Sequence, residues 1–547
     1  MIDTGDQPNR QTIPRWLSIR ESRHLGELGA IARPKSDMQV NLVREANHYL
    51  DADFDRAAER WIATNALEDA EELIGVALLA GRLNDPQAER AGLAMLERAT
   101  ADDARLQFIR RVLARNTSTD GDANLPVEEA QIRVDIAKRK RLLDLNPRDA
   151  LRLAESALLY VNVGQNKSAW PLLRRALILR PDDRYVPRAA SRFFMHTGAP
   201  DEAEHFLKAS SATLSDPWLR SALFAVQAAS GSAISGWRRA KSLLGDAKFS
   251  NRDLSELAVQ MGSMEYEAGS RKQAIRMLRQ GARSPTENAI AQIGWVARHR
   301  ADFKHADLHI DISLSKEASA YTAYEQSSWK DAVEHCARWR EIEPFSVRPA
   351  ILATFIGCVS MEGLEEAATV GGYGLLANPR NKTLLNNLAA VRALQGRFAE
   401  ARHLIGRAFA SLGDDDDDIV VTATSGLIDF REQKFDAGIK HYLDAIEKAR
   451  QAKNIDLTFR AICFLAREVA RVDHEQGRVL LDKIDAQFDT ATKRGIAIPK
   501  DISAIRAHIG DAVRIGTGRA QALASIESLN WANVIGDGGA PFLEDEQ

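Results

Sequence analysis

Several kinds of residue recur along this chain at a spacing of 34, and this regularity limits the fold more than any other feature of the sequence. Three pairs share the spacing: Pro147 with Pro181, Gly164 with Gly198, and Ala169 with Ala203. Further on, alanine recurs at steps of 35 and 34, at Ala332, Ala367 and Ala401. A fixed period of about 20 to 50 residues is the signature of repeat proteins, in which each unit packs mainly on its neighbours. The chain is therefore expected to be an array rather than a set of unrelated domains.

The composition indicates that the repeating unit is helical. The chain of 547 residues has 34 glycines and 17 prolines, about 9% of the sequence, where about 12% is average. Hydrophobic residues make up 45% of the chain but aromatic residues only 6%. A core built mainly from alanine and leucine is typical of closely packed helices, so all-β and disordered chains are poor hypotheses.

One stretch, residues 150–181, shows what the unit looks like. Leu153, Ala157 and Tyr160 fall on one face of a first helix, and Gly164 lies at the break that follows it. A second helix then runs to Pro181. Its inner face is predicted to consist of Ala169, Leu173 and Ala176. The unit is thus a helical hairpin in which small residues allow the two helices to approach closely.

Residues 382–413 repeat this pattern most clearly, with Leu385, Leu388 and Ala389 in the first helix, Gly396 at the turn and Ala401 in the second. Both stretches resemble the tetratricopeptide repeat (TPR) family, whose units carry a small and an aromatic residue, a turn glycine, two alanines and a closing proline. The resemblance implies an all-α fold, a right-handed superhelical solenoid of helix-turn-helix repeats. Several copies lack the family's first-helix tryptophan. About eight to ten units are expected.

The array does not account for the whole chain. We predict an extended N-terminal segment, an all-helical N-terminal portion, a linker, the TPR-like array, C-terminal helices and a tail whose last dozen residues are disordered. Their bounds are 1–36, 37–115, 116–126, 127–453, 454–515 and 516–547. The role of residues 1–115 is left open.

The usual signatures of catalysis are absent from the sequence. It contains no phosphate-binding Gly-x-x-x-x-Gly-Lys-Ser/Thr loop, no Gly-x-Ser-x-Gly elbow and no His-Glu-x-x-His pair. The glycine-rich run at 371–374 falls inside a predicted second helix and is interpreted as close packing. His335 adjoins Cys336, but neighbouring helical residues point about 100° apart and do not face each other. We therefore expect no enzymatic activity and no cofactor.

Two groups of residues resemble metal ligands and are interpreted otherwise. His305 and His309 share a predicted helical face but lack a complete ligand set. The run Asp414 to Asp418 lacks the spaced ligands and glycine of a calcium loop. Surface histidines and a solvated acidic connector are the favoured interpretations, and no metal site is predicted.

Charge and cysteine usage bear on partners and location. The net charge is −3 and the isoelectric point about 6.5, so no overall positive charge draws the chain to nucleic acid or lipid. The start of the sequence does not read as a secretory signal, and no apolar stretch is long enough to span a membrane. The three cysteines are scattered, which suits a reducing compartment. A cytoplasmic protein without a membrane partner is expected.

One local charge excess suggests a binding surface. From Arg133 to Arg192 there are 14 lysines and arginines against 6 acidic residues. In TPR arrays the first helices line a concave groove, so the resemblance implies that polar residues of these helices face a partner. Arg188, Arg192 and His196, each four residues apart, would form the main contact stripe for an acidic segment. The full set of predicted partner-binding residues is Asn162, Arg188, Arg192, His196, Tyr321, Tyr324 and Asn386.

Three functional hypotheses remain open on the sequence. The favoured one is a non-catalytic scaffold or adaptor that binds a partner protein or peptide in the groove of the array. The second is binding of single-stranded RNA or other nucleic acid through the basic stretch 133–192, since related helical-hairpin repeats read RNA. The third is an unrecognised enzymatic role in the N-terminal portion.

Overall fold

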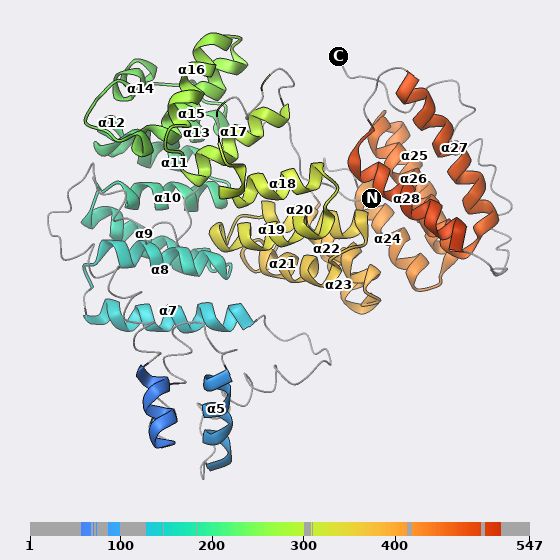
Figure 1. Cartoon of the computed structure of the whole chain (residues 1–547), viewed down its shortest axis with the longest axis horizontal. Coiled ribbons are helices and arrows are strands. Elements are labelled where there is room, and N and C mark those ends of the chain that lie inside the picture. Colours follow the sequence, from blue (N-terminus) through green and yellow to red (C-terminus); the bar gives the residue numbers. More distant parts are fainter. Residues whose placement is uncertain are drawn as a thin grey trace. The chain divides into compact units, whose positions relative to one another are not determined.

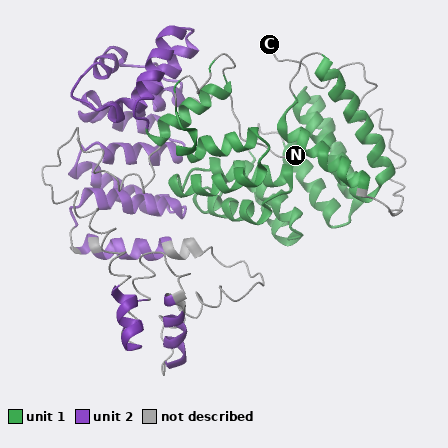
Figure 2. Ribbon diagram, viewed as in Figure 1, with its two compact units in different colours: residues 1–11, 286–547 green, residues 12–285 purple. Residues whose placement is uncertain are grey.

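The fold is all-helical in the part of the chain that the computed structural model describes. That part comprises residues 56–66, 69–70, 73, 86–98, 127–145, 147–181, 183–299, 303, 308, 310–412, 418–493 and 498–515. The chain divides into two compact units, one ending at Pro285 and the other running from Thr286 onward (Figure 2). No helix among the described residues has the length and apolar character needed to cross a membrane.

Unit 2, the part before Thr286, is a succession of helices that pack against their sequence neighbours (Figure 1). Its helices are α5 (Pro86–Arg98), α7 (Val127–Leu145), α8 (Ala150–Asn162), α9 (Asn166–Leu179), α10 (Tyr185–His196), α11 (Pro200–Ala209), α12 (Ala212–Ser215), α13 (Pro217–Ser230), α14 (Trp237–Leu244), α15 (Asn251–Glu267) and α16 (Arg271–Gly281). The hairpins are α8 with α9, α10 with α11, α13 with the short α14, and α15 with α16.

Unit 1, the part from Thr286 onward, continues the same construction. Its helices are α17 (Glu287–His299), η3 (Ile312–Leu314), α18 (Lys316–Glu325), α19 (Trp329–Ile342), α20 (Arg348–Ser360), α21 (Leu364–Ala377), α22 (Lys382–Leu394), α23 (Phe398–Ala410), α24 (Ile419–Arg431), α25 (Phe435–Gln451), α26 (Ile455–Val472), α27 (His474–Lys493) and α28 (Lys500–Ile515). The last helix, α28, packs on α26, on α27 and back on α20.

Local sequence explains where the hairpins begin and turn. The Asp149 side chain accepts a hydrogen bond from the amide of Arg152 at the start of α8, and Asn381 does the same at the start of α22. Gly164 and Gly198, which recur 34 residues apart, both adopt left-handed φ angles, 71° and 74°, after first helices. Residues with a Cβ disfavour this conformation. The repeat of glycine in the sequence is therefore a repeat of the same turn.

First and second helices of the hairpins are buried to different extents. In α22 every residue from Leu384 to Val391 is buried, whereas the second helix α23 buries only Ala401, Leu404, Ile405 and Ala408. The same contrast separates α8 from α9, whose buried residues are Ala169, Leu173 and Ala176. First helices thus form an inner layer, and second helices present their remaining sides to solvent.

The predicted α-solenoid fold is confirmed: each unit is a stack of helical hairpins. The predicted inner face of α9 matches the residues that are buried there. The glycine run at 371–374 lies inside α21, as expected, and a Cβ on Gly374 would stand 2.4 Å from the Cβ of Ala350. One departure is α12, a four-residue helix inserted between two hairpins.

The predicted division of the chain is not tested by these units. Segments 1–36, 116–126 and 516–547 lie outside the described residues, as does most of 37–115. The candidates His305 and His309, and residues 414–417 of the acidic run, also lie outside them. Helices α26, α27 and α28 occupy the stretch predicted to hold the C-terminal helices, and α26 and α27 are longer than most of those before them.

Candidate functional site

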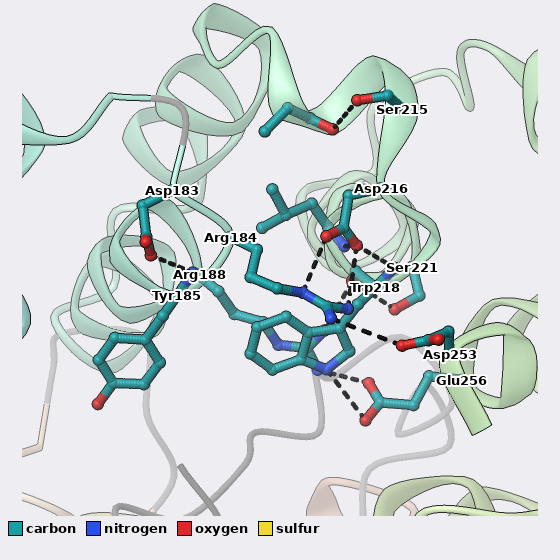
Figure 3. Close-up of polar contacts among 12 residues, drawn as sticks. Asp183, Arg184, Tyr185, Arg188, Ser215, Asp216, Trp218, Ser221, Asp253 and Glu256 are labelled. Atoms are coloured by element: carbon teal, nitrogen blue, oxygen red, sulfur yellow. Dashed lines mark hydrogen bonds and ion pairs between the residues drawn. The ribbon is translucent and has the colours of Figure 1, made fainter. Parts of the chain in front are cut away.

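A buried network of charges joins three successive first helices of unit 2 (Figure 3). We call it the inner ladder. Its members are Arg184, Arg188, Asp216, Trp218, Asp253 and Glu256. They lie at the starts of α10, α13 and α15, in pairs. Each of the six is less than one-tenth exposed.

Arg188 is the centre of the inner ladder. Its Nη2 donates to Oε2 of Glu256 at 2.6 Å, and its Nη1 donates to the carbonyl oxygen of Trp218 at 2.7 Å. The guanidinium carbon lies 4.1 Å from the centre of the Trp218 ring, and Trp218 Nε1 donates to the other oxygen of Glu256 at 3.2 Å. Burial lowers the pKa of Arg188, while the charge of Glu256 acts in the opposite direction. The charge of Arg188 is therefore balanced within the protein.

Arg184 forms the second group of ion pairs in the inner ladder. Its Nε lies 2.9 Å from Oδ2 of Asp216, and its Nη1 lies 3.5 Å from Oδ1 of Asp253. Asp216 also caps α13 by accepting from the amides of Trp218 and Leu219. Burial raises the pKa of Asp216, and the nearby Arg184 opposes that rise. One carboxylate thus caps its own helix and ties it to the hairpin before.

Unit 1 has a comparable cluster around Glu468 of α26. Arg431 of α24 lies 2.7 Å from Oε2 of Glu468, and Arg467 donates to Oε1 at 3.0 Å. Arg467 also donates to the carbonyl oxygen of Cys358, 109 residues away on α20, at 2.7 Å. Burial acts to raise the pKa of Glu468, but the two arginines outweigh it and hold the pKa at about 2. Buried ion pairs therefore link inner helices in both units.

The predicted partner-binding residues lie in both units. Four are in unit 2: Asn162, Arg188, Arg192 and His196; three are in unit 1: Tyr321, Tyr324 and Asn386. Only His196 and Tyr324 are even partly exposed. Arg188 and Arg192 are 3% and 4% exposed, and the ion pair with Glu256 gives Arg188 a structural role that the sequence interpretation did not include.

The remaining predicted residues are also tied into the array. Arg298 lies 4.1 Å above the ring of Tyr321, and Tyr324 meets Trp329 edge-on with ring centres 5.6 Å apart. Asn386 is 1% exposed and donates to Oδ1 of Asn387. Asn162 is 6% exposed, and its Oδ1 accepts no hydrogen bond from the described residues. Their contact with a partner stays a prediction.

The sequence did carry a signal for the inner ladder that was missed. Arg188 and Glu256 are 68 residues apart, which is two periods of 34. An arginine and a glutamate at the same face of first helices, two repeats apart, can meet across the repeat between them. Arg188 was instead assigned to a contact stripe, and Glu256 was not considered.

The cysteines and His335 are not in environments that would activate a nucleophile. Burial raises the pKa of Cys358 and of Cys463 to about 12 and that of Cys336 still higher, so all three thiols stay protonated. Burial also lowers the pKa of His335. Within the described ranges, no group of three or more histidine, cysteine or acidic side chains is placed to hold a metal ion.

The outer side of α16 carries a second set of cations. We call it the outer stripe: Lys272, Arg276, Arg279 and Arg283. Steps of four and three residues place Lys272, Arg276 and Arg279 along one face of α16, and Arg283 follows in the turn after the helix ends at Gly281. All four are exposed, and no ion pair or hydrogen bond to their side chains occurs within the described part of the chain. They border an open hollow of about 1020 Å³ whose described lining contains no carboxylate.

These hairpins define the class of the protein, a helical-repeat protein of the α-solenoid type. Comparison of the sequence with protein-family models gives no match, and comparison with curated proteins gives none either. Among solved structures, similarity is found to a human IFIT1 dimer with PPP-AAAA, at 13% identity and a TM-score of 0.30, over 72% of this chain and 96% of that one. Yeast Tom70 is similar at 12% identity and a TM-score of 0.27, over 86% of this chain and 96% of that one.

Proposed function

We propose that this protein is a non-catalytic scaffold that binds a partner protein through an acidic segment. Stacked hairpins support the proposal because a solenoid offers an extended surface rather than an enclosed pocket. The buried ion pairs of the inner helices support it as well, since they hold neighbouring hairpins in register and keep the outer helices in a fixed arrangement. The three buried, free cysteines suit the cytoplasmic location that the sequence favours.

The observation that carries the acidic partner is the outer stripe on α16. Arg184 and Arg188 each have an internal carboxylate, whereas the described residues supply none to the four cations of the stripe. Charges without an internal partner attract an oppositely charged surface and speed its association. The helical part of the stripe, from Lys272 to Arg279, is about 10 Å long, and Arg283 extends it past the end of α16, which matches a short carboxylate-rich segment.

Nucleic acid is the alternative partner, through the basic stretch 133–192. Part of that stretch is used inside the protein, because Arg139 pairs with Glu155, and Arg184 and Arg188 belong to the inner ladder. Binding of single strands usually combines cations with aromatic stacking platforms. The described lining of the hollow beside the outer stripe contains no aromatic side chain, so the stripe does not have the composition of a single-strand site. The protein partner is therefore favoured.

The test is a binding titration of the full chain with two labelled probes, an oligoglutamate peptide and a single-stranded RNA, at about 50 and about 150 mM salt. Arg276→Glu with Arg279→Glu should weaken peptide binding about fivefold or more, since two attractive contacts become repulsive. The matched control is Arg174→Glu with Arg175→Glu, which makes the same charge change on exposed positions of α9. Peptide binding should survive the control.

Two results would overturn the proposal. Equal loss of peptide binding in both variants would mean that only overall charge matters, and the outer stripe would have no special role. RNA binding that exceeds peptide binding, and that is lost in the α9 variant, would move the function to the basic stretch.

A further inference from the structure

Arg220 on α13 is a buried arginine without a counter-charge. Its side chain is 4% exposed, and its Nε is buried without a hydrogen-bond acceptor. No hydrogen bond or ion pair reaches its guanidinium from any residue that the structure describes. Burial lowers the pKa of Arg220, and the next contribution is the positive charge of Arg239. An uncompensated buried cation is costly, which suggests that an anion completes this site.

The guanidinium of Arg220 lies directly over the residue that precedes α14. A Cβ built on Gly236 would stand 2.7 Å from Nη1 of Arg220 and 3.3 Å from Cζ. Gly236 also has a left-handed φ of 79°. A residue with a side chain would clash with Arg220 here and would also disfavour the left-handed φ. Glycine avoids both and lets the backbone lie close to the arginine.

The start of α14 offers further donors at the same place. No side chain caps this helix, and its first backbone hydrogen bond runs from the amide of Ala240 to the carbonyl oxygen of Gly236. The amides of Trp237, Arg238 and Arg239 have no acceptor among the described residues. Free amides and the positive end of the helix dipole favour an anion.

Arg239 adds a second guanidinium, which is held in place by a hydrogen bond to the backbone. Its Nε donates to the carbonyl oxygen of Leu214 at 2.8 Å, and the side chain is exposed. Glu204, whose carboxylate accepts a hydrogen bond from Ser232 in the loop before α14, also pairs with Lys208 and accepts from Gln227. Glu204 does not contribute to the electrostatic environment of Arg220. Asp246, just after the end of α14, lies close enough to interact with Arg239, whereas no described carboxylate acts on Arg220. The buried guanidinium of Arg220 and the start of α14 therefore lack a neutralising acid.

We propose that the start of α14 binds a phosphate group, held by Arg220, Arg239 and the amides of the first helical turn. A doubly charged phosphate suits this site better than a singly charged carboxylate because it balances both guanidinium groups and has enough oxygens for the amides as well. The loop from Gly231 to Gly236 is mostly exposed, so the group can arrive as free phosphate or on a phosphorylated side chain. This site is separate from the outer stripe and does not depend on the proposed function.

The test uses the full chain and calorimetric titration with inorganic phosphate, O-phosphoserine and acetate at constant ionic strength. Phosphate and O-phosphoserine should bind one per chain, and the tighter of the two identifies the source of the group. Arg220→Met should weaken both about tenfold, the expected loss of one charge-assisted hydrogen-bonding group. Arg174→Met on α9 is the matched control and should leave both affinities unchanged.

A thermal readout separates a binding residue from a structural one. In phosphate-free chloride buffer Arg220→Met should unfold at the same temperature as the wild-type chain or a higher one, because an uncompensated charge has been removed. Phosphate should raise the unfolding temperature of the wild-type chain only. The proposal is overturned if phosphate does not bind, if acetate binds equally well, or if Arg220→Met lowers the unfolding temperature equally in both buffers.

Discussion

The inner ladder and the outer stripe use the same residue types for opposite purposes. Arg188 lies between a tryptophan ring and a glutamate and is almost completely buried. Arg276 and Arg279, on the outer side of α16, are exposed and have no counter-charge within the described residues. The difference shows that the role of an arginine depends on which carboxylates the neighbouring hairpins bring to it. In this pair of sites the first helices use charge to join repeats, whereas the second helix α16 leaves charge available to a partner.

Removing a charge from the inner ladder should have the largest effect. Arg188→Met leaves Glu256 as a buried carboxylate without its cation, and we expect the free energy of unfolding of unit 2 to fall by about 3 to 5 kcal/mol. Urea denaturation followed by tryptophan fluorescence measures this, because Trp218 stacks on the arginine.

Two further variants sharpen that experiment. Arg276→Met in the outer stripe should change the unfolding free energy by less than about 0.5 kcal/mol. The double variant Arg188→Met with Glu256→Gln should recover most of the lost stability, since no buried charge is left unpaired. A loss below about 1 kcal/mol for Arg188→Met alone would contradict the structural role of the ladder.

In unit 1, the stability that the buried ion pairs of Glu468 contribute can be measured through its dependence on pH. Its pKa is about 2 in the folded chain against an ordinary value of 4.5, which corresponds to about 3 kcal/mol. Because the folded pKa is the lower one, this stability is present above pH 4.5 and is lost as the pH falls toward 2. The difference in unfolding free energy between the wild-type chain and Glu468→Gln should therefore shrink over that interval.

The exposed Glu475 on α27 supplies the control. Glu475→Gln should leave the pH dependence of unit 1 unchanged over the same interval. A difference between wild type and Glu468→Gln that stays constant with pH would show that the carboxylate is not stabilised by Arg431 and Arg467.

Substitution of two glycines in α21 compares the packed and the open side of a single helix. The expected changes in stability are smaller than those for the buried charges. A Cβ on Gly374 would stand 2.4 Å from the Cβ of Ala350 and 3.0 Å from Cδ2 of Leu384, so Gly374→Ala should destabilise by about 1 to 3 kcal/mol. Gly372 has no atom within 4 Å of the same position. Gly372→Ala should stabilise by about 0.5 to 1 kcal/mol through helix propensity. Thermal unfolding of both variants measures the contrast, and effects of the same sign would contradict it.

Much of the fold could be predicted because the hairpin is a local structure. Turn glycines such as Gly164 and Gly198, and small residues such as Ala169, recur at one period, and each acts within a few residues of its own position. The insertion of α12 was not predicted, since four residues are too few to show a period.

The site was harder to predict because exposure is not a local property. Arg188 was expected to face a partner, and its four-residue spacing from Arg192 was interpreted as an exposed stripe. Which side of a first helix is covered depends on the neighbouring repeats, and the partner of Arg188 lies 68 residues away. Arg220 likewise has an ordinary sequence context, and its position over Gly236 appears only in the folded chain.

The sequence by itself determined the all-helical hairpin array, because helix periodicity, capping residues and turn glycines act over short distances. Only the tertiary structure decided which charges are satisfied inside and which are left for a ligand. The physical reason is that the cost of burying a charge depends on whether an opposite charge lies within a few ångströms. In a repeat array that neighbour comes from another hairpin, one or two periods along the chain.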